Sequence, residues 1–142
     1  MKKVLLIGST GLVGSRVKAL SGSEFDFIDP DENELNLLDP KGLTSFMEKH
    51  KPDAIVNFAA YTNVGEAENQ TGDESAACWQ VNVVGVKNLL EAINENTHLI
   101  QISTDMVFSG DKEDPGPYKA DHLLPDSSDK LTWYGWTKNR GE

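Results

Sequence analysis

Three glycines spaced as GxxGxxG follow the first apolar run of the chain. Residues 3–7 have the composition of a buried strand, and residues 8–14 (GSTGLVG) come directly after it. Glycine lets the backbone turn tightly and approach a pyrophosphate, whose charge then rests on the N-terminus of the following helix. The spacing predicts a strand, a dinucleotide-binding turn and a helix. The expected cofactor contacts in this turn are Gly8, Thr10, Gly11, Leu12, Val13 and Gly14.

An acidic residue stands where such a turn needs one. Asp29 ends the next apolar run, residues 25–28, about 20 residues after the first glycine. There a carboxylate accepts hydrogen bonds from the adenosine ribose, and it should repel a 2′-phosphate and favour NADH. A solvated aspartate after a simple glycine turn is the alternative.

Short continuous apolar runs, typical of buried strands, alternate along the chain with segments whose apolar residues recur at helical spacing. Strands are expected at residues 3–7, 25–28, 54–59 and 99–103, and helices at 12–20, 40–50, 73–95 and from 132 onward. Residues 109–129 are rich in Gly, Pro and Asp and should form a loop. In the first helix Leu12, Val13, Val17 and Leu20 should form the apolar side. This order predicts an α/β fold, a doubly wound parallel sheet whose ligands bind at the carboxyl ends of the strands.

Composition narrows the function classes. The 142 residues suffice for one domain, residues 1–142, and the formal net charge of −10 argues against nucleic-acid or membrane partners. No apolar run approaches the roughly 20 residues that span a bilayer. The single cysteine, Cys78, forms no internal disulfide and fits the cytoplasm. The three histidines share no ligand spacing, so no metal site is predicted.

A tyrosine and a lysine lie one helical turn apart near the end of the sequence. In the segment YGWTK, Tyr134 and Lys138 should share one face of a helix. The ammonium would stabilise phenolate and lower the pKa of the tyrosine, which suits it to act as a general acid. Thr104 follows a predicted strand and would orient the substrate carbonyl. With a nicotinamide cofactor, these three residues suit carbonyl reduction.

Several further residues are candidate cofactor contacts. Small residues at a strand end, Ala59 and Ala60 before Tyr61, would let a flat cofactor lie against the backbone, although they also suit tight helix packing. Asn82 lies within a predicted helix, where asparagine is unfavourable, so it either hydrogen-bonds to sheet backbone or faces water. Ser103, next to Thr104, completes this set, and both hydroxyls could instead satisfy backbone groups.

Together these motifs resemble those of the extended short-chain dehydrogenase/reductases, and within them the chain is most similar to the dTDP-4-dehydrorhamnose reductase family. The matching segments cover nearly the whole sequence: residues 8–14, 51–57, 59–62, 67–68, 81–82, 102–105, 107–108, 110, 117–118, 134–135, 137–138 and 141–142. The resemblance implies a Rossmann fold, NADPH or NADH as cofactor, and Thr104, Tyr134 and Lys138 as the catalytic triad. It further implies that Leu37, Ser103, Tyr134 and Lys138 contact the cofactor.

The resemblance also suggests an activity. It implies reduction of the 4-keto group of a nucleotide-linked 6-deoxyhexose in dTDP-L-rhamnose synthesis, possible homodimers, and a fold truncated before the last strands and the substrate domain. Residues 1–142 alone are then expected to be inactive. Two alternatives remain open: an epimerase or dehydratase that recycles bound NAD, and a non-catalytic, dinucleotide-binding regulatory subunit.

Overall fold

A four-stranded parallel sheet organises the first part of the structure, a computed structural model that describes residues 1–142. The chain divides into two units, residues 1–60 with 85–102, and residues 61–84 with 103–142. Within the first unit the strands lie in the order β2-β1-β3-β4. Their bounds are β1 (Lys3–Ile7), β2 (Asp26–Ile28), β3 (Ala54–Asn57) and β4 (His98–Gln101).

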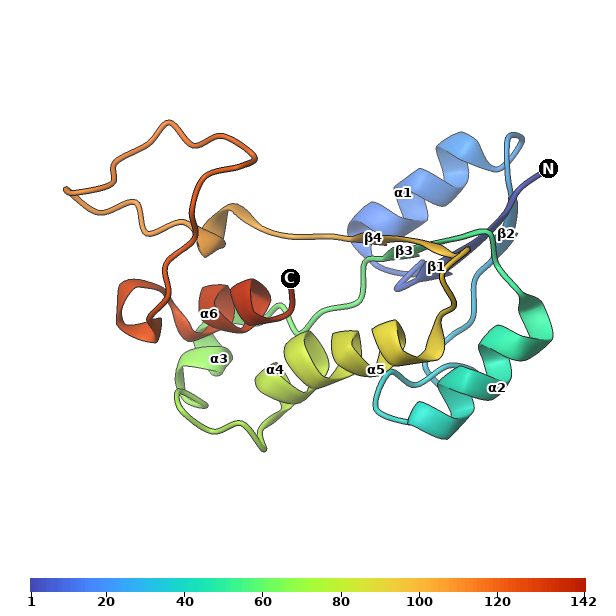
Figure 1. The fold of residues 1–142 in the computed structure, drawn as a ribbon, viewed down its shortest axis with the longest axis horizontal. Helices are drawn as coiled ribbons and strands as arrows, with labels where there is room; N and C mark the ends of the chain where they lie inside the picture. The colour runs from blue at the N-terminus through green and yellow to red at the C-terminus, as the bar shows by residue number, and fades with distance from the viewer. The chain divides into compact units, whose positions relative to one another are not determined.

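The strand order reverses at β1, as in a doubly wound sheet. Strand β1 pairs with β2 on one side and with β3 on the other, and Ile7 is in register with Asn57. Figure 1 shows α1 (Leu12–Ser21) on one face of the sheet, with α2 (Pro40–His50) and α5 (Gly85–Ala92) on the other. The predicted fold class, an α/β Rossmann-like parallel sheet, is confirmed. In sheets of this kind ligands bind at the carboxyl ends of the strands where the order reverses, which here are the ends of β1 and β3.

The core of this unit lies between the sheet and the α2/α5 layer. Leu5, Leu43, Ile55 and Leu89 are fully buried, and each stabilises the fold by about 2 kcal/mol. The Nδ2 of Asn88 donates to the Leu37 carbonyl oxygen at 2.9 Å and joins α5 to the segment before α2. The N-terminus of α2 agrees with its sequence signal, since Asp39 is the N-cap and Pro40 occupies the first turn.

The predicted apolar side of the first helix is wrong. Leu12, Val13 and Leu20 are 91, 57 and 63% exposed, and Gly14 is the one buried residue of α1. The first turn of α1 packs directly on the backbone of the glycine turn. Only Gly14, which has no side chain, fits at this contact, so no apolar side chain is buried there. Helical periodicity identifies a possible apolar face but does not show which face meets the sheet.

The helix expected over residues 73–95 is shorter and interrupted. Helix α4 (Ala77–Trp79) leads into a π-helical turn (Gln80–Val84), and α5 then ends at Ala92. Strands β3 and β4 end at Asn57 and Gln101, two residues earlier than expected. Because π-helical turns are frequent at functional sites, Asn82 at the centre of this turn is a candidate functional residue.

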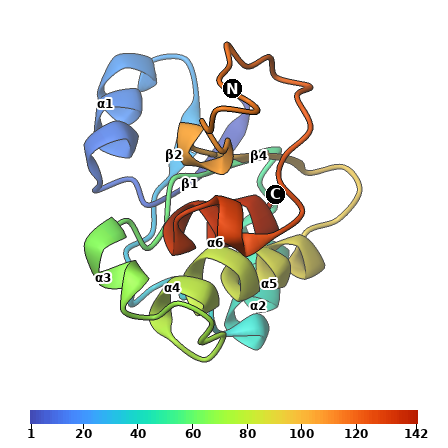
Figure 2. The ribbon, with the colours of Figure 1, turned by 90° about the vertical axis from the view of Figure 1, so that its left-hand side faces the viewer.

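The second unit is built around α6 (Trp133–Arg140). Helix α6 packs against α3 (Val64–Glu68), α4, the π-helical turn and a 3₁₀ turn (Asp105–Val107), and Figure 2 shows it beside α3 and α4. The rings of Trp79 and Trp133 stack with centroids 5.7 Å apart. A further 3₁₀ turn covers Ser128–Lys130. None of the helices in the structure combines the length and apolar character needed to cross a membrane.

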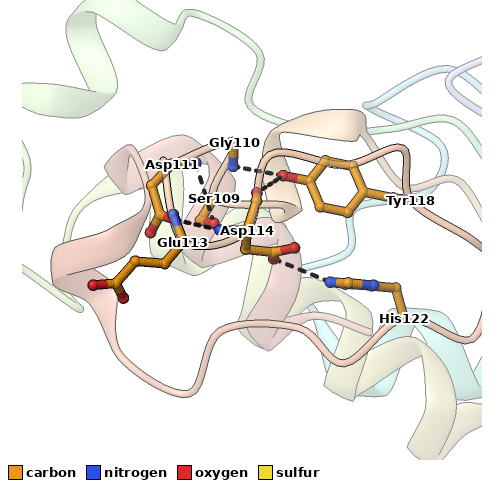
Figure 3. Close-up of polar contacts among 7 residues, drawn as sticks. All are labelled: Ser109, Gly110, Asp111, Glu113, Asp114, Tyr118 and His122. Carbon is orange, nitrogen blue, oxygen red and sulfur yellow. Dashed lines mark hydrogen bonds and ion pairs between the residues drawn. The ribbon is translucent and has the colours of Figure 1, made fainter.

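The loop predicted over residues 109–129 is ordered by its own side chains (Figure 3). The Tyr118 hydroxyl accepts a hydrogen bond from Gly110 N at 2.8 Å and donates one to the Asp114 carbonyl. The Tyr118 ring stacks on Phe108 at 4.3 Å, and His122 Nε2 lies 3.0 Å from Asp114 Oδ2. These contacts hold a segment that has no regular secondary structure before Ser128.

Candidate functional site

The glycine turn forms a tight bend between β1 and α1. Gly8 has φ of +79°, and a Cβ there would lie 2.8 Å from Ala59 N. A Cβ on Gly14 would lie 2.5 Å from the Gly8 carbonyl oxygen. Any side chain would therefore displace backbone at both positions, so glycine is required to bring strand, turn and helix this close.

The N-terminus of α1 is suited to an anion. Gly11 is the N-cap, so no side chain caps the first turn, and no acidic residue lies in that turn. Backbone N–H groups and the positive end of the helix dipole then face solvent between the exposed Thr10 and Leu12. The turn fits the pyrophosphate of a dinucleotide by its shape, its donors and its lack of negative charge.

The predicted ribose acid has a partner that the sequence did not reveal. Asp29 directly follows β2, and its Oδ2 forms an ion pair with Lys18 Nζ from the last turn of α1. The two side chains are one-third and one-half exposed. The carboxylate therefore faces both solvent and a cation at the end of β2.

The end of β3 is shaped by a buried asparagine. The Nδ2 of Asn57 donates to Gln101 Oε1 at 2.8 Å, and its Oδ1 accepts from Ala59 N at 3.1 Å. The second bond holds the backbone of Ala59, which is partly exposed, as is Ala60; both are predicted cofactor contacts. Leu37, another predicted contact, lies in the core of this unit. A polar residue inside the apolar run 54–59 was the signal that could have identified Asn57.

The tyrosine and lysine of the second unit lie on one buried helix. Tyr134 and Lys138 of α6 are 9 and 5% exposed. Thr132 caps α6 by accepting a hydrogen bond from Gly135 N at 3.0 Å, and Glu68 accepts one from Trp133 N at 2.6 Å. Two side-chain oxygens thus accept hydrogen bonds from backbone N–H groups in the first turn of α6. They fix where the helix begins and therefore where Tyr134 lies.

Both predicted hydroxyl residues lie in the same unit. Thr104 is the N-cap of the 3₁₀ turn, where its hydroxyl accepts from Met106 N at 3.3 Å, and its side chain also hydrogen-bonds to Tyr134. The Ser103 hydroxyl donates to the Glu142 carboxylate. The structure therefore brings Thr104 to the phenol of Tyr134, as a shared carbonyl-binding role requires.

Burial changes the electrostatics of this pair. Desolvation raises the pKa of Tyr134 above its ordinary value, and the Thr104 hydrogen bond opposes the shift only in part. The expectation that the pKa of Tyr134 is lowered by Lys138 is therefore wrong, because desolvation of the phenol has the largest effect and raises this pKa. Desolvation also lowers the pKa of Lys138, against the attraction of Glu142. At neutral pH the phenol is protonated, which is the state a general acid needs.

These shifts predict a stability effect at Lys138. A lysine whose pKa is lowered on folding costs stability below that pKa, and the cost fades as the pH rises toward its unfolded value. Lys138→Met should therefore leave the melting temperature at pH 7 unchanged or higher, and this gain should shrink at alkaline pH. Thermal unfolding of both proteins between pH 6 and about 10 measures it. A large loss of stability at pH 7 would contradict the prediction.

Asn82 organises the π-helical turn. Its Oδ1 accepts from Tyr61 N at 2.8 Å, and its Nδ2 donates to the Tyr61 carbonyl at 3.2 Å and to Thr137 Oγ1 at 3.0 Å. The side chain is 2% exposed and does not face water, and the backbone that it contacts is that of Tyr61, which lies beyond the end of β3 and outside the sheet. Asn82 thereby joins the segment at Tyr61 to α6, one residue before Lys138.

Cys78 belongs to the same buried network. Its Sγ lies 3.3 Å from Thr137 Oγ1, and burial raises the pKa of the thiol. A protonated, fully buried thiol is unreactive, in agreement with a packing role. The predicted site residues thus fall into two groups: the glycine turn, Asp29, Leu37, Ala59 and Ala60 in the first unit, and Tyr61, Asn82, Ser103, Thr104, Tyr134 and Lys138 in the second.

Comparison with known proteins places this chain in a family. The profile of the RmlD substrate binding domain matches residues 1–142, the whole chain. The chain belongs to the RmlD substrate binding domain family. Curated relatives resemble this chain at about one-third sequence identity.

Three relatives show what this RmlD family chain is similar to. A dTDP-4-dehydrorhamnose reductase of Aggregatibacter actinomycetemcomitans is 33% identical over 100% of this chain and 46% of its own length. A probable dTDP-4,6-dihydroxy-2-methyloxan-3-one 4-ketoreductase of Streptomyces antibioticus is 34% identical over 97% of this chain and 44% of its own. A crystal structure of the Bacillus anthracis dTDP-4-dehydrorhamnose reductase in complex with NADP has a TM-score of 0.83 at 26% identity, and the match covers 99% of this chain and 48% of that one. The chain therefore spans less than half the length of these relatives.

Proposed function

We propose that this RmlD family protein is an NAD(P)H-dependent reductase of the 4-keto group of a nucleotide-linked 6-deoxyhexose. One observation carries the proposal: a protonated, buried tyrosine stands one helical turn from a buried lysine and is hydrogen-bonded by Thr104. Its relatives support the substrate class, since two are named as reductases of dTDP-linked keto sugars. The glycine turn supports the cofactor class, and a Bacillus anthracis relative was crystallised with NADP.

The residues of the chain would divide the reaction among them. A bound nicotinamide dinucleotide would supply the hydride to the carbonyl carbon. Thr104 would donate a hydrogen bond to the carbonyl oxygen, and Tyr134 would give its phenolic proton to the alkoxide that forms there. Lys138 would then stabilise the phenolate left behind. Because burial raises the pKa of Tyr134, the phenol stays protonated at neutral pH, but the same burial disfavours the phenolate that forms when the proton is given away, so a nearby ammonium is needed to stabilise that charge.

The glycine turn would hold the other end of the cofactor. The N–H groups at the start of α1 would bind the pyrophosphate, and Asp29 would accept hydrogen bonds from the adenosine ribose. The turn would act through its backbone groups, and glycine occupies its tightest points, where a Cβ would meet backbone atoms.

Enzyme assay of the full-length protein tests the proposal. We expect oxidation of NADPH or NADH, followed by its absorbance, when a dTDP-4-keto-6-deoxyhexose is added, with one 4-hydroxy sugar formed per cofactor oxidised. Conversion of the sugar without net cofactor oxidation would instead indicate an epimerase or dehydratase. Cofactor binding with no conversion of any keto sugar tested would indicate a binding subunit. Either result would overturn the proposed reduction.

A further inference from the structure

An ion pair stands at the place where a dinucleotide-binding sheet distinguishes its cofactors. Lys18 comes from the last turn of α1 and Asp29 from the end of β2, and the two side chains, 47 and 33% exposed, form an ion pair. Helix α1 and strand β2 both belong to the first unit. The parallel pairing of β1 with β2 positions the end of β2 beside the helix that follows β1. This position is the expected site of the adenosine ribose, whose 2′-substituent alone distinguishes NADH from NADPH.

We propose that Lys18 is a specificity-determining residue that lets this site accept the 2′-phosphate of NADPH beside Asp29. The inference rests on the proposed function, because it requires a dinucleotide at the glycine turn. Asp29 alone would favour NADH, since its carboxylate accepts hydrogen bonds from ribose hydroxyls and repels a phosphate. Lys18 neutralises that carboxylate and offers an ammonium to the incoming phosphate.

The exchange of partners needs little rearrangement. A phosphate monoester carries about −1.5 to −2 charges near pH 7, so it attracts the ammonium more strongly than one carboxylate does. The lysine stem is flexible and half-exposed, so Nζ can move from Asp29 to the phosphate without disturbing the core. With NADH bound, Lys18 would stay with Asp29, and the carboxylate would still accept from the ribose.

Two of the acids that follow Asp29, Asp31 and Glu34, are engaged in a local turn. The Oδ1 of Asp31 accepts from the backbone N–H groups of Asn33 and Glu34 at 2.8 and 3.0 Å. The Oε2 of Glu34 accepts from Asp31 N at 3.0 Å. These bonds commit both carboxylates to a local turn, and the carboxylate that pairs with Lys18 is that of Asp29.

Binding measurements on single variants test the proposal. Dissociation constants of NADPH and NADH are measured by calorimetry, at one ionic strength, for the full-length protein and for Lys18→Met. We expect Lys18→Met to weaken NADPH binding about 10- to 100-fold and to change NADH binding less than about threefold. The fragments 2′,5′-ADP and 5′-AMP should show the same contrast, because they differ only in the 2′-phosphate.

Two further variants sharpen the result. Asp29→Asn should strengthen NADPH binding and weaken NADH binding, because it removes both the repulsion and the ribose acceptor. Lys87→Met is the matched control, since it removes another exposed lysine that is ion-paired, to Glu91 at 3.9 Å on α5, in the same unit. It should change neither dissociation constant. Far-UV circular dichroism checks that each variant is folded.

The outcomes separate the two proposals. If Lys18→Met weakens NADPH and NADH equally, or changes neither, Lys18 does not set specificity, while dinucleotide binding and the proposed reductase stand. If the unmodified protein binds neither dinucleotide, the proposed function fails and this inference fails with it. Selective loss of NADPH and 2′,5′-ADP, with the Lys87→Met control unchanged, supports the assignment.

Discussion

Replacing Tyr134 with phenylalanine should reduce the kcat of keto-sugar reduction by about 10²- to 10⁴-fold, the usual contribution of a positioned general acid. The ring would keep its packing on buried α6, so KM and the cofactor dissociation constant should change little. The loss arises because phenylalanine has no proton to give to the alkoxide and Thr104 loses its hydrogen-bond partner. Steady-state kinetics with saturating cofactor measures the effect.

Tyr118→Phe is the matched control for this loss. It removes the same hydroxyl from the loop of Figure 3, where that group bonds to Gly110 N and the Asp114 carbonyl and is not a proposed contact of cofactor or substrate. We expect a lower melting temperature and a kcat within about threefold of the unmodified protein. Equal kcat in the Tyr134→Phe variant and the unmodified protein would exclude Tyr134 as the acid and favour a binding role.

Replacing Gly135 with alanine should lower the free energy of unfolding by about 3 kcal/mol, a large effect for a single methyl group. A Cβ at this position would lie 2.2 Å from the Met106 carbonyl oxygen, a backbone atom of the 3₁₀ turn. Relief requires α6 to move away from that turn. Because Thr104 caps the turn and Tyr134 precedes Gly135, the same movement would separate the acid from its partner and lower kcat.

Gly65→Ala provides the contrast in the same unit. Gly65 lies in α3, is exposed, and a Cβ there would meet nothing closer than Asn63 Oδ1 at 3.9 Å. Alanine should therefore raise the free energy of unfolding by about 0.5–1 kcal/mol through its higher helix propensity. Chemical denaturation of both variants measures the two effects. Similar stability of the Gly135→Ala variant and the unmodified protein would show that α6 is not tightly packed on the 3₁₀ turn.

Short-range signals were sufficient for the elements that depend on neighbouring residues. The strand before the glycine turn, the helix after it and the start of α2 at Asp39 and Pro40 agree with the structure, since turn geometry and capping involve only a few consecutive residues. The shared face of Tyr134 and Lys138 follows in the same way from one helical turn. Their chemical roles remain predictions that the two tyrosine variants test.

Other features depended on residues far apart in the chain. The exposed apolar side of α1, the π-helical turn and the role of Asn82 could not be predicted, because each depends on which distant backbone lies against the helix. The pKa of Tyr134 was predicted in the wrong direction because spacing reveals a neighbouring charge but not the amount of water excluded around it.

By itself, the sequence determined the kind of fold, the glycine turn proposed to bind a dinucleotide and the residues proposed for catalysis, since glycine geometry and residue chemistry are local properties. Only the tertiary structure decided how those residues are tuned. It paired Asp29 with Lys18, brought Thr104 to Tyr134, and buried the tyrosine and lysine of α6. Burial and charge pairing depend on how the folded chain excludes water and joins distant segments, and no spacing within the sequence records either one.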